Sequence, residues 1–213
     1  MSIESVAAVV GGTPYMSVDQ AQRMADLIAE NNLARVLELG FAHGVSTCYL
    51  ADAVGEMPNG FVTSIDLTSS AELEPRAEDL LERCGLSSRV DLIREPRSFT
   101  WRIMYWLAEG RSDCFDLVYL DGGHTWDVTG FAFFLVDRLL APGGWLVFDD
   151  IDWTVGASPF YRQSGRADNL PEDFRTTQQV RNVFELLVTP HQSYVDATIV
   201  DGWGMARKSL EAH

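Results

Sequence analysis

The sequence predicts an α/β fold in which a seven-stranded, mostly parallel β-sheet is covered by helices on both faces. Short apolar runs alternate with amphipathic segments over residues 18–150, and strands that alternate with helices at this spacing form a parallel sheet. Right-handed crossovers then place helices on both faces of that sheet. Near the C-terminus, two strand-like runs flank Asp201-Gly202, a hairpin-type turn. This hairpin is expected to add an antiparallel edge.

Five short apolar runs are expected to form the parallel strands. Each run is of strand length and is bounded by polar or turn-forming residues, as buried strands are. The predicted strands cover Arg35 to Gly40, Phe61 to Leu67, Arg89 to Glu95, Phe115 to Asp121 and Gly143 to Asp150.

Amphipathic patterns between these runs predict the helices that cover the sheet. The expected helices cover Val18 to Asn31, Gly44 to Val54, Leu73 to Cys84, Phe99 to Glu109, Val128 to Leu140 and Thr177 to Val188. A chain of 213 residues suits one domain with a substantial core. Residues 1–213 are therefore expected to form a single domain, with residues 1–33 as an N-terminal helical cap.

The segment from Asp152 to Arg175 is polar, contains glycine and proline, and has no clear periodicity. Loops this long inside a compact domain are usually lids, binding loops or disordered segments. We expect this segment to be a substrate loop, with the substrate bound beneath it and the N-terminal segment.

Composition and charge exclude several classes of function. The net charge of −15 would repel phosphate backbones and no basic cluster offsets it, so nucleic acid is not an expected partner. No GxxxxGK[ST] loop is present, which excludes P-loop ATP chemistry. Cys48, Cys84 and Cys114 include no CxxC pair and are expected to be reduced core thiols. No apolar run reaches the ~18 residues of a membrane helix, and a cytoplasmic location is expected.

A glycine-rich turn follows the first predicted strand, in the segment LELGFAHGVST. Gly40 would permit a tight turn, and Gly44 would let a ligand approach the backbone at the start of the next helix. Asp66 ends the second strand and is placed to accept hydrogen bonds from the ribose of a nucleoside cofactor. The spacing E-x-G-x-x-x-G differs from the dinucleotide fingerprint G-x-G-x-x-G. An ordinary turn with a capping aspartate is the alternative interpretation.

Carboxylates also end the fourth and fifth predicted strands. Asp121 is followed by two glycines and His124, and the fifth strand stops on Asp149 and Asp150. The carboxyl ends of neighbouring parallel strands meet at one edge of the sheet, so three oxygen ligands could gather there around a hard divalent cation. The alternative is a solvated acidic loop that caps the following helix, with His124 as a loop residue.

Together these motifs resemble the successive motifs of class I S-adenosylmethionine (SAM)-dependent methyltransferases. The resemblance runs from about Ala34 to Trp153 and includes the segments FDLVYLDGGH and LLAPGGWLVFDD. It implies a Rossmann-like sandwich in which SAM is bound by Glu38, Gly40, Gly44, Ser46, Asp66, Ser98 and Asp121. Gly40 and Gly44 would flank the methionine part of SAM. Asp66 would hold the ribose, and Ser98 would lie near the adenine.

Within that superfamily, the acidic pattern is similar to that of metal-dependent O-methyltransferases such as catechol O-methyltransferase and the macrolide-sugar O-methyltransferases. The macrolide-sugar branch also carries a D-x-x-H, matched here by Asp121 to His124. The resemblance implies that Asp121, Asp149 and Asp150 hold Mg²⁺ or Mn²⁺, and that Asp121 and His124 are the catalytic residues. His124 would be the general base, because a neutral imidazole accepts a proton near pH 7.

We therefore expect a metal-dependent O-methyltransferase that moves the methyl group of SAM to a hydroxyl of a small molecule, such as a natural product. Catechols, sugars and polyketide hydroxyls remain open as acceptors, and a homo-oligomer is compatible with the sequence. Trp126 and Trp153, which follow the acidic clusters, would line the acceptor pocket or pack in the core. The alternatives are a metal-free methyltransferase, a nicotinamide-dependent oxidoreductase and a non-catalytic SAM-binding partner protein.

Overall fold

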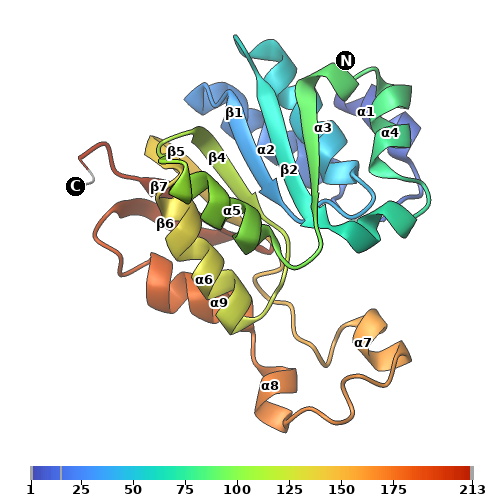
Figure 1. The fold of residues 1–213 in the computed structure, drawn as a ribbon, viewed down its shortest axis with the longest axis vertical. Helices are drawn as coiled ribbons and strands as arrows, with labels where there is room; N and C mark the ends of the chain where they lie inside the picture. The colour runs from blue at the N-terminus through green and yellow to red at the C-terminus, as the bar shows by residue number, and fades with distance from the viewer. Residues whose placement is uncertain (1, 15, 212–213) are drawn as a thin grey trace.

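A computed structural model of the protein describes residues 2–14 and 16–211, which form three layers with one β-sheet between two groups of helices (Figure 1). The strands are Arg35–Leu39 (β1), Phe61–Leu67 (β2), Val90–Glu95 (β3), Phe115–Leu120 (β4), Leu140–Phe148 (β5), Tyr194–Val200 (β6) and Trp203–Lys208 (β7). Their order in the sheet is β3-β2-β1-β4-β5-β7-β6. The first five strands pair in parallel, and β7 pairs antiparallel with β5 and β6. The predicted sheet and its C-terminal hairpin are confirmed.

The order of the strands reverses beside β1. From β1 the chain moves outward to β2 and β3, and it then returns to place β4 on the other side of β1. The register aligns Leu39 at the end of β1 with Leu120 at the end of β4. Open parallel sheets bind ligands outside the carboxyl ends of the strands at such a reversal. The fold therefore positions a ligand site where β1 and β4 end.

The helices form two layers, one on each face of the sheet (Figure 1). One layer contains Ile3–Val10 (α1), Val18–Asn31 (α2), Val45–Ala53 (α3) and Ala77–Cys84 (α4). The other contains Phe99–Ala108 (α5), Trp126–Asp137 (α6) and Gln179–Val183 (α9), which continues as a π-helical turn over Phe184–Val188. None of the described helices is both long and apolar enough to cross a bilayer.

Alternate residues of the central strands pack against the two helical layers. Val36 and Leu117 belong to the core beneath α1 to α4, whereas Leu37 and Val118 belong to the core beneath α5, α6 and α9. Successive side chains of a strand point to opposite faces of the sheet. A strand buried on both faces must therefore be apolar at consecutive positions, which accounts for the continuous apolar runs in the sequence.

The segment between β5 and α9 forms an arm that extends away from the body of the molecule (Figure 1). The arm contains two short helices, Pro159–Gln163 (α7) and Glu172–Thr176 (α8), where the sequence predicts a loop without periodicity. The amide of Gly156 donates a hydrogen bond to the carbonyl of Arg175 (2.9 Å). This bond ties the two ends of the arm together at its base.

One helix boundary differs from the prediction because strand pairing intervenes. The sequence predicts a helix from Val128 to Leu140, but α6 ends at Asp137 and β5 begins at Leu140. Leu140 pairs with Phe115 of β4, so the chain must leave the helical conformation before that residue. This pairing joins segments that are distant in the sequence, so the periodicity of the helix itself cannot predict where the helix ends.

Candidate functional site

A cavity of about 610 Å³ opens at the carboxyl ends of β1 and β4. Small-molecule sites typically have volumes of roughly 300–1,000 Å³. The end of β2, the turns that follow β1, β4 and β5, and the start of α3 contribute to its lining residues 40–42, 45, 46, 66, 121–124, 150 and 153. Pro14 of the N-terminal segment and residues 158, 159 and 161 of the arm complete it. Both segments that were expected to cover the substrate therefore reach the cavity.

Gly40 and Gly44 are required by the packing of the chain against itself. Both have positive φ angles, 94° and 84°, which favour glycine. A Cβ on Gly40 would lie 2.4 Å from the carbonyl oxygen of Asp121, and a Cβ on Gly44 would lie 2.6 Å from the Cβ of Ala77. Gly44 does not line the cavity. The absence of a side chain at Gly44 makes room for α4, and the approach of a ligand to its backbone stays a prediction.

Asp66 ties the glycine turn to the end of β2. Its Oδ2 accepts hydrogen bonds from the amides of Phe41 (2.9 Å) and Ala42 (2.6 Å), and its Oδ1 accepts one from the amide of Leu67 (2.6 Å). A carboxylate has about four acceptor sites. Because Asp66 also lines the cavity, it can order the turn and still accept a hydrogen bond from a ligand.

Glu38 lies beneath the turn and does not line the cavity. Its side chain is fully buried, and its oxygens accept hydrogen bonds from the hydroxyls of Ser46 (2.5 Å), Thr47 (2.6 Å) and Ser64 (2.6 Å). Burial raises the pKa of Glu38 to about 7, and the three hydroxyls only partly offset this shift. Glu38 therefore supports the turn through these hydrogen bonds, and its contact with a cofactor stays a prediction. Ser46 lines the cavity but donates its hydroxyl to Glu38.

Ser98 caps the N-terminus of α5, and its Oγ accepts a hydrogen bond from the amide of Thr100 (3.2 Å). It is not among the residues that line the cavity, and its place near an adenine ring stays a prediction. Of the seven residues predicted to bind a cofactor, those that line the cavity are Gly40, Ser46, Asp66 and Asp121.

Asp121, His124 and Asp150 come together inside the cavity. His124 Nε2 lies 3.5 Å from Oδ1 of Asp121 and 3.6 Å from Oδ2 of Asp150. This nitrogen is buried, and no described residue forms a hydrogen bond with it. One potential ligand atom from each of the three residues lies within 4.8 Å of the others. Two carboxylates and an imidazole at this spacing are able to hold a divalent cation.

The carboxylates of this cluster shift one another's pKa values. Burial raises the pKa of Asp121 to about 7, and the nearby charges of Asp149 and Asp150 add to that shift. Burial also raises the pKa of Asp150. For His124, burial lowers the pKa, but the surrounding carboxylates outweigh burial and raise it above its usual value. The cluster therefore favours a cationic ligand.

Residues 37–151, which are more than half of the chain, match the family described as a methyltransferase domain. The matched stretch begins in β1 and ends just after β5, so it includes the glycine turn and both acidic strand ends. The chain belongs to this methyltransferase family. No curated protein matches the sequence of this chain significantly.

Solved structures share the fold of this methyltransferase at low sequence identity. An O-methyltransferase from Bacillus cereus in complex with S-adenosylhomocysteine (SAH) is 22% identical with a TM-score of 0.67, covering 97% of this chain and 90% of that one. TomG from Streptomyces achromogenes is an O-methyltransferase involved in tomaymycin synthesis, and its structure is in complex with SAM. It is 22% identical with a TM-score of 0.66, and the match covers 97% of this chain and 89% of TomG. Cofactor-bound Rv0187 from MTB is 24% identical with a TM-score of 0.65, and the match covers 99% of this chain and 88% of Rv0187. The family match confirms the predicted methyltransferase, and these structures share its Rossmann-like fold.

Asp149, the third predicted metal ligand of the methyltransferase, does not line the cavity. Its Oδ2 accepts a hydrogen bond from the hydroxyl of Tyr119, and its Oδ1 accepts one from Nε1 of Trp203 (3.0 Å). The structure thus groups Asp121 and Asp150 with His124, and it keeps Asp149 outside this group.

Trp153 and Tyr161 form an aromatic wall beside the imidazole of the methyltransferase cavity. The ring centroids of His124 and Trp153 lie 5.2 Å apart, and those of Trp153 and Tyr161 lie 6.0 Å apart. Trp126 is exposed and does not line this cavity. Tyr161 comes from the arm, where the only signal in the sequence was the length and lack of periodicity of the segment.

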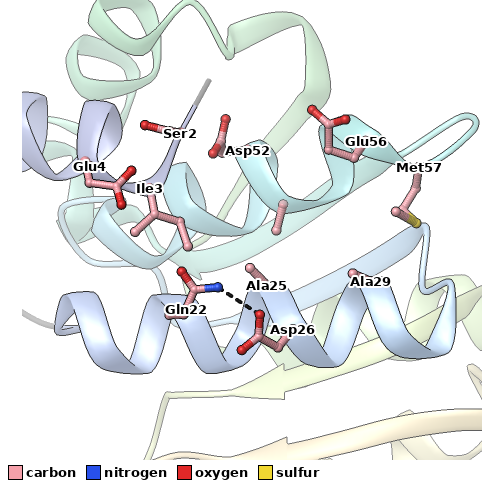
Figure 2. A pocket seen from close by; sticks show the side chains of 11 residues that line it. Ser2, Ile3, Glu4, Gln22, Ala25, Asp26, Ala29, Asp52, Glu56 and Met57 are labelled. Carbon is pink, nitrogen blue, oxygen red and sulfur yellow. Dashed lines mark hydrogen bonds between the residues drawn. The ribbon is translucent and has the colours of Figure 1, made fainter.

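A second cavity of the methyltransferase, of about 320 Å³, lies between α1, α2 and the end of α3 (Figure 2). Its lining includes the acidic residues Glu4, Asp26, Asp52 and Glu56. Gln22 donates a hydrogen bond to Asp26 across one turn of α2 (2.8 Å). None of the predicted site residues lines this cavity. The candidate site is therefore the cavity at the carboxyl ends of β1 and β4.

Proposed function

We propose that the protein transfers the methyl group of SAM to a hydroxyl of a small molecule, with the assistance of a divalent cation. The observation that carries the proposal is the position of His124. Its buried Nε2 lies between the carboxylates of Asp121 and Asp150 and has no hydrogen-bond partner among the described residues. A hydroxyl acceptor must lose a proton as it is methylated, and a nitrogen in this setting can accept it.

The charge of the cavity supports SAM as the methyl donor. SAM carries a sulfonium and an ammonium cation, and the cavity lining includes the carboxylates of Asp66, Asp121 and Asp150. No arginine or lysine is among the described residues that line it. The diphosphate of a nicotinamide cofactor would be repelled there. This contrast, together with the family match, argues against the oxidoreductase alternative.

The donor set also fits a divalent cation. Mg²⁺ is commonly held by one or two carboxylates together with waters and substrate oxygens, and Mn²⁺ accepts similar ligands. Asp121 and Asp150 supply two carboxylates that can reach one point. When bound, such a cation would orient the acceptor oxygens and lower the pKa of the hydroxyl.

Each residue has a separate task in this proposal. Asp66 orders the glycine turn and accepts hydrogen bonds from the ribose, while Asp121 and Asp150 hold the cation. His124 accepts the hydroxyl proton as the carbon–sulfur bond of SAM breaks and the new carbon–oxygen bond forms in line with it. The products are a methyl ether, SAH and a protonated imidazole. Trp153 would pack against the acceptor beside His124.

Chelation tests the metal-assisted reaction. Methyl transfer from SAM to catechol, sugar and polyketide hydroxyls is measured before EDTA treatment, after it, and after addition of Mg²⁺ or Mn²⁺. We expect chelation to abolish transfer, either cation to restore it, and Asp150→Asn to prevent the restoration. Asp127→Asn, which alters an exposed carboxylate outside the cavity, is the control.

Two outcomes of this experiment favour the alternatives. Full transfer by protein shown to be free of metal would favour a metal-free methyltransferase, in which the carboxylates only order the loops. Binding of SAM without transfer to any acceptor, with and without metal, would favour a non-catalytic partner protein.

A further inference from the structure

Asp149 is surrounded by hydrogen-bond donors from three parts of the chain. Tyr119 in β4 donates its hydroxyl to Oδ2, and Trp203 in β7 donates its indole N–H to Oδ1 (3.0 Å). The amide of Asp150 also donates to Oδ1 (2.7 Å). Tyr119 and Trp203 are fully buried, and their rings meet edge-on with centroids 6.0 Å apart. Both oxygens of Asp149 are thus engaged with the protein itself.

The same contacts hold the backbone that carries Asp150. Asp150 has a φ angle of 54°, a conformation that residues other than glycine adopt sparsely and that their surroundings must support. Its amide is held by Asp149, and the next amide, that of Ile151, donates to the carbonyl of Gly202 in the β6–β7 turn (3.0 Å). The C-terminal hairpin therefore supports the chain on both sides of Asp150.

We propose that Asp149 is a positioning residue which, together with Tyr119 and Trp203, holds Asp150 in the conformation that directs its carboxylate toward Asp121 and His124. The inference rests on the proposed function, and it replaces the direct metal contact expected of Asp149. Groups that hydrogen-bond around metal-binding side chains commonly change metal affinity by about 10- to 100-fold when they are removed. Tyr119 and Trp203 would therefore influence a site that neither residue touches.

The affinity for Mn²⁺ alone, measured by EPR on the purified protein, tests this inference without an acceptor. Tyr119→Phe and Trp203→Phe each remove one donor to Asp149 and keep an aromatic ring. Tyr194→Phe is the matched control, because the buried Tyr194 hydroxyl donates to Asp137 (2.9 Å) away from the cavity. Urea unfolding and SAH binding establish that each variant is folded.

Tyr119→Phe and Trp203→Phe should each weaken Mn²⁺ binding by about 10- to 100-fold. Tyr194→Phe should lose stability but leave Mn²⁺ affinity unchanged, and SAH affinity should be unchanged in all three variants. If one of the two test variants does not fold, the other decides the question. Wild-type Mn²⁺ affinity in the folded test variants would overturn the inference.

Asp149→Asn and Asp150→Asn separate a positioning residue from a direct ligand. Asp150→Asn should lose more Mn²⁺ affinity than Asp149→Asn. Adding Tyr119→Phe to Asp149→Asn should cause little further loss, because both changes break the same hydrogen-bonded unit. The inference would be overturned if both asparagine variants lost the same Mn²⁺ affinity and Tyr119→Phe had its full effect in the Asp149→Asn background.

The wild-type measurement distinguishes failure of the inference from failure of the proposed function. If the wild type binds no Mn²⁺, the metal-assisted reaction is contradicted and the inference falls with it. If the wild type binds Mn²⁺ and both phenylalanine variants bind it equally well, only the positioning role of Asp149 is overturned.

Discussion

Nε2 of His124 lies 3.5 Å from Oδ1 of Asp121, although only two glycines separate these residues in the chain. Gly123 (φ 87°) and His124 (φ 41°) both have left-handed backbone conformations, which bring the imidazole back beside the carboxylate. A Cβ on Gly123 would lie 2.5 Å from the side chain of Val128, so the same turn packs closely against α6. The turn therefore places an acid and a base in one cavity at the end of β4.

Replacing His124 with glutamine should lower kcat by about 10²- to 10⁴-fold, the usual contribution of a positioned general base. The affinities for SAM and Mn²⁺ should change little, because the proposed role of His124 is toward the acceptor. Steady-state kinetics on an acceptor identified by screening will measure the effect. The control is His191→Gln, which removes an imidazole packed against Phe133 and Tyr194.

Two results would contradict this role of His124. A kcat close to that of the wild type in His124→Gln would show that the proton is accepted elsewhere. Coupling of an imidazole nitrogen to bound Mn²⁺ in the pulsed EPR spectrum of the wild type, absent from His124→Gln, would instead make His124 a metal ligand.

Replacing Asp66 with asparagine should weaken SAM binding by roughly 1.5–3 kcal/mol, the range for a hydrogen bond to a charged group. The variant loses the charge that we propose faces the ribose, and it also weakens the bonds that hold the amides of Phe41 and Ala42. Isothermal titration calorimetry with SAM measures the change, with Asp127→Asn as the control. Unchanged SAM affinity in folded Asp66→Asn would refute the ribose assignment.

Glu38 should make the protein less stable as the pH rises toward neutrality. Burial raises its folded-state pKa from 4.5 to about 7, so between these values the folded state binds a proton that the unfolded state has lost. The stabilisation is fully present below pH 4.5 and is lost as the pH rises through 7. A shift of this size corresponds to at most roughly 3 kcal/mol.

Glu38→Gln should abolish this dependence, because an amide does not titrate in that range. Urea unfolding of both proteins at pH 5 and pH 8 gives the difference in their unfolding free energies at each pH. Between pH 5 and pH 8, the unfolding free energy of the wild type should fall relative to that of Glu38→Gln. The same difference at both values would show that Glu38 is ionised in the folded protein throughout.

Replacing Gly44 with alanine should destabilise the protein more than replacing Gly85 does. Both glycines have positive φ angles, but a Cβ on Gly85 meets nothing within 4 Å, whereas one on Gly44 lies 2.6 Å from the Cβ of Ala77. Gly85→Ala should cost about 1–2 kcal/mol for its backbone conformation, and overpacking should add about 1–3 kcal/mol for Gly44→Ala.

Ala77→Gly removes the atom that a Cβ on Gly44 would meet. In the Gly44→Ala background, Ala77→Gly should therefore restore part of the lost free energy of unfolding, as measured by urea unfolding. Equal losses in the two single alanine variants, with no recovery in the double variant, would contradict the assignment of Gly44 to helix packing.

The strands could be predicted because a buried strand carries its signal within its own residues. Leu117 and Val118 face different cores, so the run that contains them is apolar throughout. The end of α6 could not be predicted in this way, because the pairing of Leu140 with Phe115 decides it. The helices of the arm are too short for their periodicity to be visible in the sequence.

The candidate site could be predicted to the level of strand ends but not of side-chain direction. Asp66, Asp121 and Asp150 line the cavity because the carboxyl ends of parallel strands share one edge. The burial of Glu38 depends on a register that pairs it with Ser64. The direction in which the Asp149 side chain points likewise depends on its hydrogen bond with Trp203, a residue of the C-terminal hairpin.

The most direct test of SAM as the methyl donor is a calorimetric titration of the wild-type protein with SAM, with NAD⁺ titrated in parallel. We predict saturable binding of SAM and no binding of NAD⁺, because the carboxylates that line the cavity favour a cationic donor and repel a diphosphate. Failure of the folded protein to bind SAM, or binding of NAD⁺ in preference to SAM, would contradict SAM as the methyl donor.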